Sequence, residues 1–313
     1  MGEKLKLVAD IGGTNTRVGL SKNSQLLRQS IQKFPNANVK SLENILVHYL
    51  NEQKLDTVSD VCVALAGPVR NDTAQMTNLS WEITKDSLAR ATGAKTVGLL
   101  NDLQAQGYAL DHLSEDQLLP VTGKRHPGSK ETKLVCGIGT GFNACTVISS
   151  SHGIVVPPAE AGHYRLPAAN QQQKEIVNMI EAKYGFASVE NILSGNGLVE
   201  LNEYFCPQTP RSAQKVIQDA TEGSCEAQEV IGVFGAFMGS ILGDLALITL
   251  PFGGIYIIGG VARAVFPFLN EQNFISSFCD KGRFSEFNSE FAVHIVDDDF
   301  AALNGCVSFL EEC

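Results

Sequence analysis

The sequence predicts an α/β protein built from two similar domains. Short apolar segments rich in β-branched residues alternate along the chain with segments of helical periodicity. A glycine-centred pattern also occurs twice, because Leu7–Leu20 reads LVADIGGTNTRVGL and Leu134–Val147 reads LVCGIGTGFNACTV. An internal repeat indicates a repeated structural unit, so we expect a duplicated α/β domain with a cleft between the copies.

Each copy of the repeat reads as a strand, a glycine-rich turn and a second strand. Short apolar runs predict further buried strands at Val61–Leu65, Thr96–Leu100 and Gly254–Ile258. Helical patterns cover Val39–Gln53, Thr84–Thr92, Asn170–Tyr184, Ser212–Thr221, Val230–Leu250 and Ala301–Glu312. The chain crosses between the halves near Leu110–Glu115. We therefore expect a small domain, 1–112, to which the C-terminal helix 299–313 returns, and a large domain, 113–298.

One apolar segment, Val230–Gly260, could be mistaken for a membrane span, which needs about 20 predominantly apolar residues. Asp244, Thr249, Pro251 and a glycine pair interrupt it, which favours a buried helix followed by a buried strand. Gly235, Gly239 and Gly243 recur at every fourth position. This spacing favours close packing against a neighbour within the fold, with a subunit contact as the alternative.

Composition excludes some classes of partner. The formal net charge of −10 and the lack of a basic stripe argue against nucleic acid. Eight scattered cysteines form no C-x-x-C pair, which favours a reducing, cytoplasmic setting over a disulfide framework or a structural zinc site. The N-terminal segment has no signal-peptide pattern, and no membrane partner is expected.

The two glycine turns are candidate phosphate sites. Gly12-Gly13-Thr14-Asn15 and Gly139-Thr140-Gly141 let backbone N–H groups approach an anion closely. Neither is a Walker A loop, and the dinucleotide fingerprint fails because Phe142 replaces its third glycine. Each turn alone is more often a tight hairpin. Together, with Asp10 ending the first strand, they favour phosphate binding.

These segments also carry a family resemblance. Asp10–Arg17 resembles the first phosphate segment of the superfamily of sugar kinases, actin and heat-shock ATPase chaperones, and Gly137–Gly141 resembles the second. Gly253–Val261 is similar to the adenosine segment. Within the superfamily the chain resembles the bacterial glucokinase family, through Met76–Trp81, Leu100–Asp102, Glu160–His163, Val189–Gly195 and Asp280–Phe284. The Cys-rich zinc segment of the ROK sugar kinases does not follow His163.

The resemblance implies two ribonuclease H-like (actin-like ATPase) domains around a deep cleft, and ATP-dependent phosphorylation of the 6-hydroxyl of glucose by a homodimer. Asp102 becomes the base for that hydroxyl, although alone it reads as a helix N-cap. The implied sugar ligands, whose polar groups match sugar hydroxyls, are Asn78, Asn101, Asp102, Glu160, His163 and Glu190. Taken singly, these residues read as turn asparagines, a first-turn helix acid at Glu190 and a structural histidine.

The implied cofactors are ATP and Mg²⁺. The nucleotide would contact Gly12, Gly13, Thr14, Asn15, Gly137, Gly139, Thr140, Gly141, Gly259 and Gly260. Asp10 would hold Mg²⁺ through water, since Mg²⁺ keeps much of its hydration shell; the alternative is a turn former at a strand end. The acidic run 297–299 reads as a solvated turn and helix cap.

The sequence departs from the family pattern beside the sugar residues. Ala159 and Ala161 replace glycines that usually flank the sugar-binding Glu, Arg165 stands near a usual acid, and Asn143 stands where the second phosphate segment often has glycine. These departures leave open a kinase for a related hexose. A non-catalytic sugar sensor and an actin-like ATPase are further alternatives.

Overall fold

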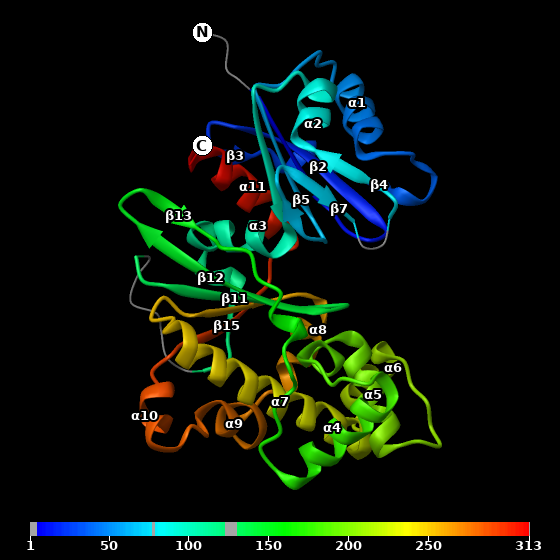
Figure 1. Ribbon diagram of the computed structural model, residues 1–313, viewed down its shortest axis with the longest axis vertical. Helices are drawn as coiled ribbons and strands as arrows, with labels where there is room; N and C mark the ends of the chain where they lie inside the picture. Colours follow the sequence, from blue (N-terminus) through cyan, green and yellow to red (C-terminus); the bar gives the residue numbers. More distant parts are fainter. Residues whose placement is uncertain (1–4, 77–78, 123–129, 313) are drawn as a thin grey trace. The chain divides into compact units, whose positions relative to one another are not determined.

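The computed structural model describes residues 5–76, 79–122 and 130–312 (Figure 1). It forms two compact units. The first comprises the described residues up to Leu113, together with Ser151–Pro158 and those from Asp298 onward, and the second comprises those of Ser114–Ser150 and Ala159–Asp297. This division differs from the predicted one at Ser151–Pro158. Within unit 1, Gln104 Nε2 of α3 (Asp102–Ala109) donates to Val156 O of this segment at 2.7 Å.

Unit 1 contains a mixed sheet of order β3-β2-β1-β5-β9, with β4 paired to β2. β1 pairs antiparallel with β2 and parallel with β5, which in turn is parallel to β9. The strand bounds are β1 Lys6–Ile11, β2 Asn15–Lys22, β3 Gln25–Leu26, β4 Gln32–Pro35, β5 Asp60–Leu65 and β9 Thr96–Asn101. A small second sheet, β6-β7-β8, was not predicted and consists of Val69–Arg70, Thr73–Gln75 and Glu82–Thr84.

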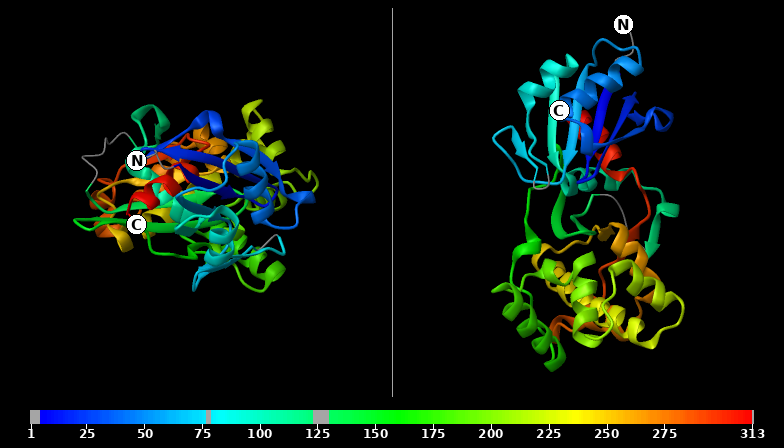
Figure 2. Two further views of the ribbon diagram at one scale, coloured as in Figure 1. Left: turned by 90° about the horizontal axis from the view of Figure 1, so that it is seen from above. Right: turned by 90° about the vertical axis from the view of Figure 1, so that its right-hand side faces the viewer.

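Helices cover both faces of this first sheet. α1 (Leu42–Glu52) and α2 (Lys85–Thr92) share a core with the alternate strand residues Leu7, Ala9 and Ile11. α3 (Asp102–Ala109) and α11 (Ala301–Glu312), the latter red in Figures 1 and 2, pack against each other and against β5. A Cβ on Gly305 would overlap Ala105 O, so this glycine allows the two helices their close approach. α11 is therefore part of unit 1, although it lies near the C-terminal end of the sequence.

Unit 2 repeats the topology with strands in the order β10-β15-β14-β11-β12, and the same sheet continues into β13 of the segment Ser151–Pro158. β11 pairs antiparallel with β12 and parallel with β14, as β1 does with β2 and β5. The bounds are β10 Leu118–Pro120, β11 Lys133–Ile138, β12 Phe142–Ser150, β13 Gly153–Val155, β14 Ile255–Ile258 and β15 Val293–Val296. The corresponding strand orders confirm the duplicated α/β fold predicted from the repeat.

The long helix α7 (Cys225–Thr249) is the centre of the unit 2 core and packs against α5, α6 and α9 (Figure 1). Among the described residues it is the one helix apolar and long enough to cross a membrane, and 67% of its most apolar stretch is buried within the protein. A Cβ on Gly239 would overlap Phe274 O. The glycine face thus packs within the fold, as predicted. The remaining helices are α4 Gln171–Tyr184, α5 Gly195–Phe205, α6 Ala213–Thr221, α8 Gly260–Val265, α9 Ser276–Cys279 and α10 Ser285–Asn288.

Helix boundaries follow local capping chemistry. The side chains of Thr84, Asn170 and Ser212 accept hydrogen bonds from the backbone N–H groups three residues later, at the starts of α2, α4 and α6. Gly93 and Gly185 end α2 and α4 in the left-handed conformation. The predicted helices are confirmed within a few residues, whereas α5 and the short helices of 260–288 were not predicted.

Candidate active site

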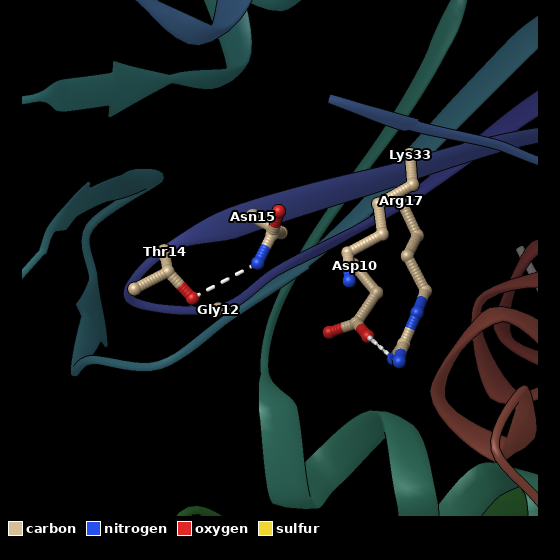
Figure 3. Close-up of a pocket in the computed structure, with 6 residues that line it drawn as sticks. All are labelled: Asp10, Gly12, Thr14, Asn15, Arg17 and Lys33. Atoms are coloured by element: carbon tan, nitrogen blue, oxygen red, sulfur yellow. Dashed lines mark hydrogen bonds and ion pairs between the residues drawn. The ribbon is translucent and has the colours of Figure 1, made fainter. Parts of the chain in front are cut away.

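The first glycine turn joins β1 to β2 in unit 1 (Figure 3). Asp10 lies directly opposite Arg17 in the antiparallel pair, and Ile11 lies opposite Thr16, so residues 12–15 form the turn. Gly12 N donates to Asn15 O at 2.9 Å, and Asn15 Nδ2 donates to Thr14 Oγ1 at 3.0 Å. We refer to residues 10–17 as the first hairpin.

A buried asparagine outside the motif holds this turn. Asn36 Nδ2 donates to Gly12 O at 2.9 Å, and Asn36 Oδ1 accepts from Thr16 Oγ1 at 2.8 Å. The backbone N of Asn36 also donates to Thr14 O at 2.9 Å. Because Asn36 is only 3% exposed, these bonds are shielded from water and fix the shape of the turn.

Charged side chains gather beside the first hairpin in a cavity of about 170 Å³, lined by Asp10, Gly12, Thr14, Asn15, Arg17 and Lys33. Arg17 Nη1 lies 3.4 Å from Asp10 Oδ2, and a dashed line marks this ion pair in Figure 3. Lys33 on β4 is the register partner of Arg17 on β2. Burial raises the pKa of the Asp10 carboxyl above its usual value, and the nearby Arg17 offsets part of this rise. Two cations and one acid leave the cavity with an excess of positive charge, which suits a polyphosphate.

The junction of β9 and α3 carries Asn101 and Asp102. Asn101 is the N-cap of α3: its Oδ1 accepts from Leu103 N at 3.0 Å, and its Nδ2 donates to Gly67 O at 3.1 Å. Asp102 is the first helical residue, with Oδ1 accepting from Leu103 N at 2.8 Å. The capping role therefore belongs mainly to Asn101. Asp102 is half-buried and lies directly after β9, the strand at one edge of the sheet.

The second glycine turn joins β11 to β12 in unit 2. Gly137 lies opposite Asn143, and Ile138 lies opposite Phe142, so residues 139–141 form the turn of this second hairpin (137–143). Gly139 N donates to Gly141 O at 3.0 Å, and Gly139 O accepts from Gly195 N at 2.8 Å. A Cβ on Gly139 would meet no described atom within 4 Å, which leaves this side of the turn open to a ligand.

Gly259 and Gly260 follow β14, the strand beside β11. Gly259 has a φ of +117°, and a Cβ there would overlap Ile138 O. Only glycine fits this conformation and this approach. A Cβ on Gly260 would meet nothing described within 4 Å. Gly259 thus allows β14 to lie close to β11, and Gly260 leaves open space beside the second hairpin.

The predicted sugar residues of unit 2 gather at the start of β12. Glu190 Oε2 accepts from Phe142 N at 2.9 Å, and a Cβ on Gly141 would overlap that same carboxylate oxygen. Glu160 and His163 belong to one exposed loop turn, in which His163 N donates to Glu160 O at 3.2 Å. Asn143 bonds this loop on both sides of Glu160.

Comparison with known proteins identifies the family. The model of the glucokinase family matches residues 7–313. The chain belongs to the glucokinase family. It is 33% identical over 312 residues to the glucokinase of Photorhabdus laumondii subsp. laumondii, covering 98% of this chain and 97% of that protein. The predicted family and its activity, ATP-dependent phosphorylation of glucose, are therefore confirmed.

Solved structures give the same result for the fold. Glucokinase from an Antarctic psychrotroph has a TM-score of 0.88 and 27% identity, with 99% of both chains covered. A ROK family glucokinase from Streptomyces griseus, solved with glucose and AMPPNP, has a TM-score of 0.68 at 19% identity, covering 97% of this chain and 98% of that one. The latter similarity confirms the actin-like ATPase fold of this glucokinase family member.

The predicted site residues are distributed over both units. Unit 1 holds Asp10, the first hairpin, Asn101 and Asp102, whereas unit 2 holds the second hairpin, the glycine pair and the sugar residues after 159. Asn78 lies outside the described residues. The acidic run contributes a local cap, because Asp298 Oδ1 accepts from Phe300 N at 2.9 Å. No cluster of three or more metal-ligating side chains occurs in the part of the chain that the structure describes.

Three residues that support the two hairpins were not predicted from the sequence. Asn36 and Lys33 lie outside the motif, and their only sequence signal was a polar segment before the first helix. Asn143 was noted as a departure without a role. Arg165, another departure, turns toward α4, where its guanidinium pairs with Glu181 and lies 4.8 Å from the centroid of the Phe186 ring.

Proposed function

We propose that Asp102 is the base for the 6-hydroxyl of glucose in the reaction with MgATP. As the hydroxyl oxygen attacks the γ-phosphorus, Asp102 accepts its proton and ADP leaves. The Asp102 carboxylate directly after β9 carries this assignment, because Asn101 supplies the N-cap of α3 and Asp102 shares only the Leu103 N–H with it.

Sugar recognition is assigned to polar groups that sugar hydroxyls can pair with. Glu160 and Glu190 carry carboxylates that accept pairs of hydroxyl hydrogen bonds, and His163 and Asn101 supply further polar atoms. The exposed positions of Glu160 and His163 and the fixed position of Glu190 support this role. Asn78 is proposed here from the family resemblance alone.

Nucleotide binding is assigned to the two hairpins and the glycine pair. Backbone N–H groups of the turns would hold phosphates, and Arg17 and Lys33 would neutralise them. The open sides of Gly139 and Gly260 support a nucleotide at that edge of unit 2.

Asp10 suits a magnesium ion that arrives with the nucleotide. Mg²⁺ commonly uses one or two carboxylates together with phosphate oxygens and water, so a single aspartate beside a phosphate cavity fits this mode. The ion would neutralise charge on the transferring phosphate. Arg17 would balance the Asp10 carboxylate when the nucleotide is absent.

The test of the base is Asp102→Asn, which keeps the shape and the acceptor for Leu103 N. We expect kcat to fall about 10²- to 10⁴-fold, with little change in glucose affinity, because only proton transfer is removed. Asp86→Asn is the matched control, since Asp86 is also an acid in a first helical turn, that of α2. Normal turnover by Asp102→Asn would sink the assignment.

The activity of the protein on hexoses other than glucose, its compartment and its assembly are further questions for experiment, and the last two are proposals. ADP release measured with a panel of hexoses tests glucose against its relatives. We propose a cytoplasmic homodimer: no disulfide joins the seven cysteines that the structure describes, which agrees with a reducing compartment, and the family resemblance implies the dimer. Mass measurement in solution tests the dimer.

A further inference from the structure

Asn143, the second residue of β12, bonds to the loop that contains Glu160 as well as to its own strand. Its Nδ2 donates to Ala159 O at 2.6 Å, and its Oδ1 accepts from Ala161 N at 2.8 Å. The same Oδ1 also accepts from Ala144 N at 2.8 Å. The bonds to Ala159 O and from Ala161 N hold the backbone immediately before and immediately after Glu160.

The neighbouring residue of β12 holds the other sugar carboxylate. Phe142 N donates to Glu190 Oε2 at 2.9 Å, and Gly141 leaves the space that this oxygen occupies. Gly162 completes the contact, because a Cβ there would overlap Phe142 O. Two consecutive residues after the phosphate turn therefore anchor Glu160 and Glu190.

We propose that Asn143 is a positioning residue for sugar binding, which fixes the backbone on both sides of Glu160 to the second phosphate hairpin. The inference rests on the proposed role of Glu160 as a sugar ligand. Asn143 itself need not touch the sugar. It acts by holding Glu160 in one place, so that less freedom is lost when glucose binds.

The two alanines of the loop agree with a fixed backbone. Neither Ala159 nor Ala161 has a positive φ, so a side chain at either position causes no backbone strain. Alanine also has less conformational freedom than glycine before it is ordered. The departures at 143, 159 and 161 thus have the same effect. The Asn143 amide hydrogen-bonds the loop backbone, and the two alanines reduce the number of backbone conformations open to the loop.

The same contacts connect the sugar loop to the nucleotide turn. Residues 139–141 precede Phe142 and Asn143 directly, so a shift of the turn is passed to both carboxylates through covalent and hydrogen bonds. If glucose and nucleotide each favour the same position of β12, each raises the affinity for the other by the same factor. We expect Asn143→Ala to reduce this factor.

The test compares Asn143→Ala with Asn202→Ala. Asn202 is a matched control, because it is buried in α5 and its Nδ2 donates to a distant backbone carbonyl, Thr209 O, at 2.9 Å. We expect Asn143→Ala to raise the KM for glucose about tenfold, through loss of two backbone contacts, while kcat changes less than about threefold. Asn202→Ala should lower the melting temperature without changing that KM.

Asn143→Asp keeps the acceptor for Ala161 N and loses the donor to Ala159 O, so an intermediate KM is expected. This variant also serves if the alanine variant folds poorly. Glucose affinity is measured by calorimetry with and without AMPPNP, and we expect the gain caused by AMPPNP to shrink in both Asn143 variants.

Glu160→Gln separates this inference from the proposed function. A raised KM for glucose in Glu160→Gln with an unchanged KM in Asn143→Ala overturns the positioning role and leaves the sugar role intact. An unchanged KM in Glu160→Gln overturns the sugar role first. An equal rise in Asn202→Ala would show that general loss of stability, not the loop contact, sets the KM.

Discussion

The two hairpins share a backbone plan and differ in their chemistry. By strand register, Asp10 and Arg17 of the first hairpin occupy the places of Gly137 and Asn143 in the second. The first therefore carries an ion pair at 3.4 Å, and the second carries a glycine opposite an amide. Each turn is closed by a bond from its first glycine N–H, at 2.9 and 3.0 Å.

From this difference we expect the two copies of the repeated unit to take different parts in phosphoryl transfer. The first hairpin gathers charge from its own strands and from β4, which suits the handling of phosphate and magnesium. The second has no charge at the equivalent positions and instead bonds the Glu190 carboxylate and the backbone beside Glu160, the two acids proposed as sugar ligands. Substitutions at equivalent positions should therefore fail in different ways.

The largest effect is expected at Asp10. Asp10→Asn removes the one carboxylate among the described residues that line the first-hairpin cavity, so we expect kcat to fall about 100-fold or more while glucose affinity is kept. Asp60→Asn, in the same sheet at the start of β5, is the control and should keep its activity. Steady-state kinetics at several Mg²⁺ concentrations measure both. A kcat within a few-fold of the wild type would remove the proposed division between the hairpins.

The same substitution has a pH-dependent effect on stability. Burial raises the pKa of the Asp10 carboxyl above its usual value, so the folded protein binds a proton there more readily than the unfolded chain does. The stability contributed by Asp10 is thus present below the unfolded pKa and is lost as the pH rises through the raised value. Asp10→Asn should be at least as stable as the wild type at pH 7, and the difference should shrink as the pH falls toward 4. Urea unfolding at a series of pH values measures this, and a marked loss of stability at pH 7 would show that the Arg17 ion pair prevails.

The next effect contrasts two glycines. A Cβ on Gly141 would overlap Glu190 Oε2, whereas a Cβ on Gly12 would lie 3.5 Å from Asn15 O, an ordinary contact. Gly141→Ala should displace the flexible Glu190 side chain and raise the KM for glucose about 10- to 100-fold, with little loss of stability. Gly12→Ala should leave that KM unchanged. Similar glucose KM values for the two variants would contradict the division of work.

A smaller effect is expected at Asn36, which stabilises the first turn. Asn36→Ala leaves Gly12 O and Thr16 Oγ1 without the amide, so we expect a loss of about 1–3 kcal/mol in the free energy of unfolding and a several-fold rise in the KM for ATP. Asn288→Ala in unit 2 is the control, because Asn288 is also buried and its Nδ2 donates to Phe278 O at 2.6 Å. It should lower stability without changing the KM for ATP. Equal KM values in both variants would argue against a role for Asn36 in the turn.

The difference between the hairpins also explains what the sequence could predict. The repeat, the strands and the helices with strong caps were visible because they depend on local patterns, as at Thr84 and Asn170. The residues within each glycine motif could be aligned for the same reason. Capping also resolved a local ambiguity, because Asn101 rather than Asp102 mainly caps α3.

The supports of each hairpin could not be predicted, because they come from other segments. Asn36 is 24 residues from Gly12, and Asn143 is 16 residues from Ala159. No periodicity connects such pairs, and an isolated asparagine in a polar stretch reads as a turn. The small sheet β6-β7-β8 was missed because its strands are only two or three residues long.

The smallest predicted effect tests whether charge around the first hairpin extends beyond the motif to Lys33. Lys33 faces Arg17 across β2 and β4, and like charges opposite one another disfavour pairing of the strands. Lys33→Met should therefore leave stability unchanged or slightly raised, while the loss of a cation near the phosphates raises the KM for ATP about two- to fivefold. Because the side chain is exposed, the rise should be larger at low salt than at high salt. Lys40→Met, an exposed lysine outside the cavity, is the control. If Lys33→Met leaves the KM for ATP unchanged at low salt, Lys33 does not contribute to ATP binding, and Asp10 and Arg17 are the charged residues of the first-hairpin cavity that act on the nucleotide.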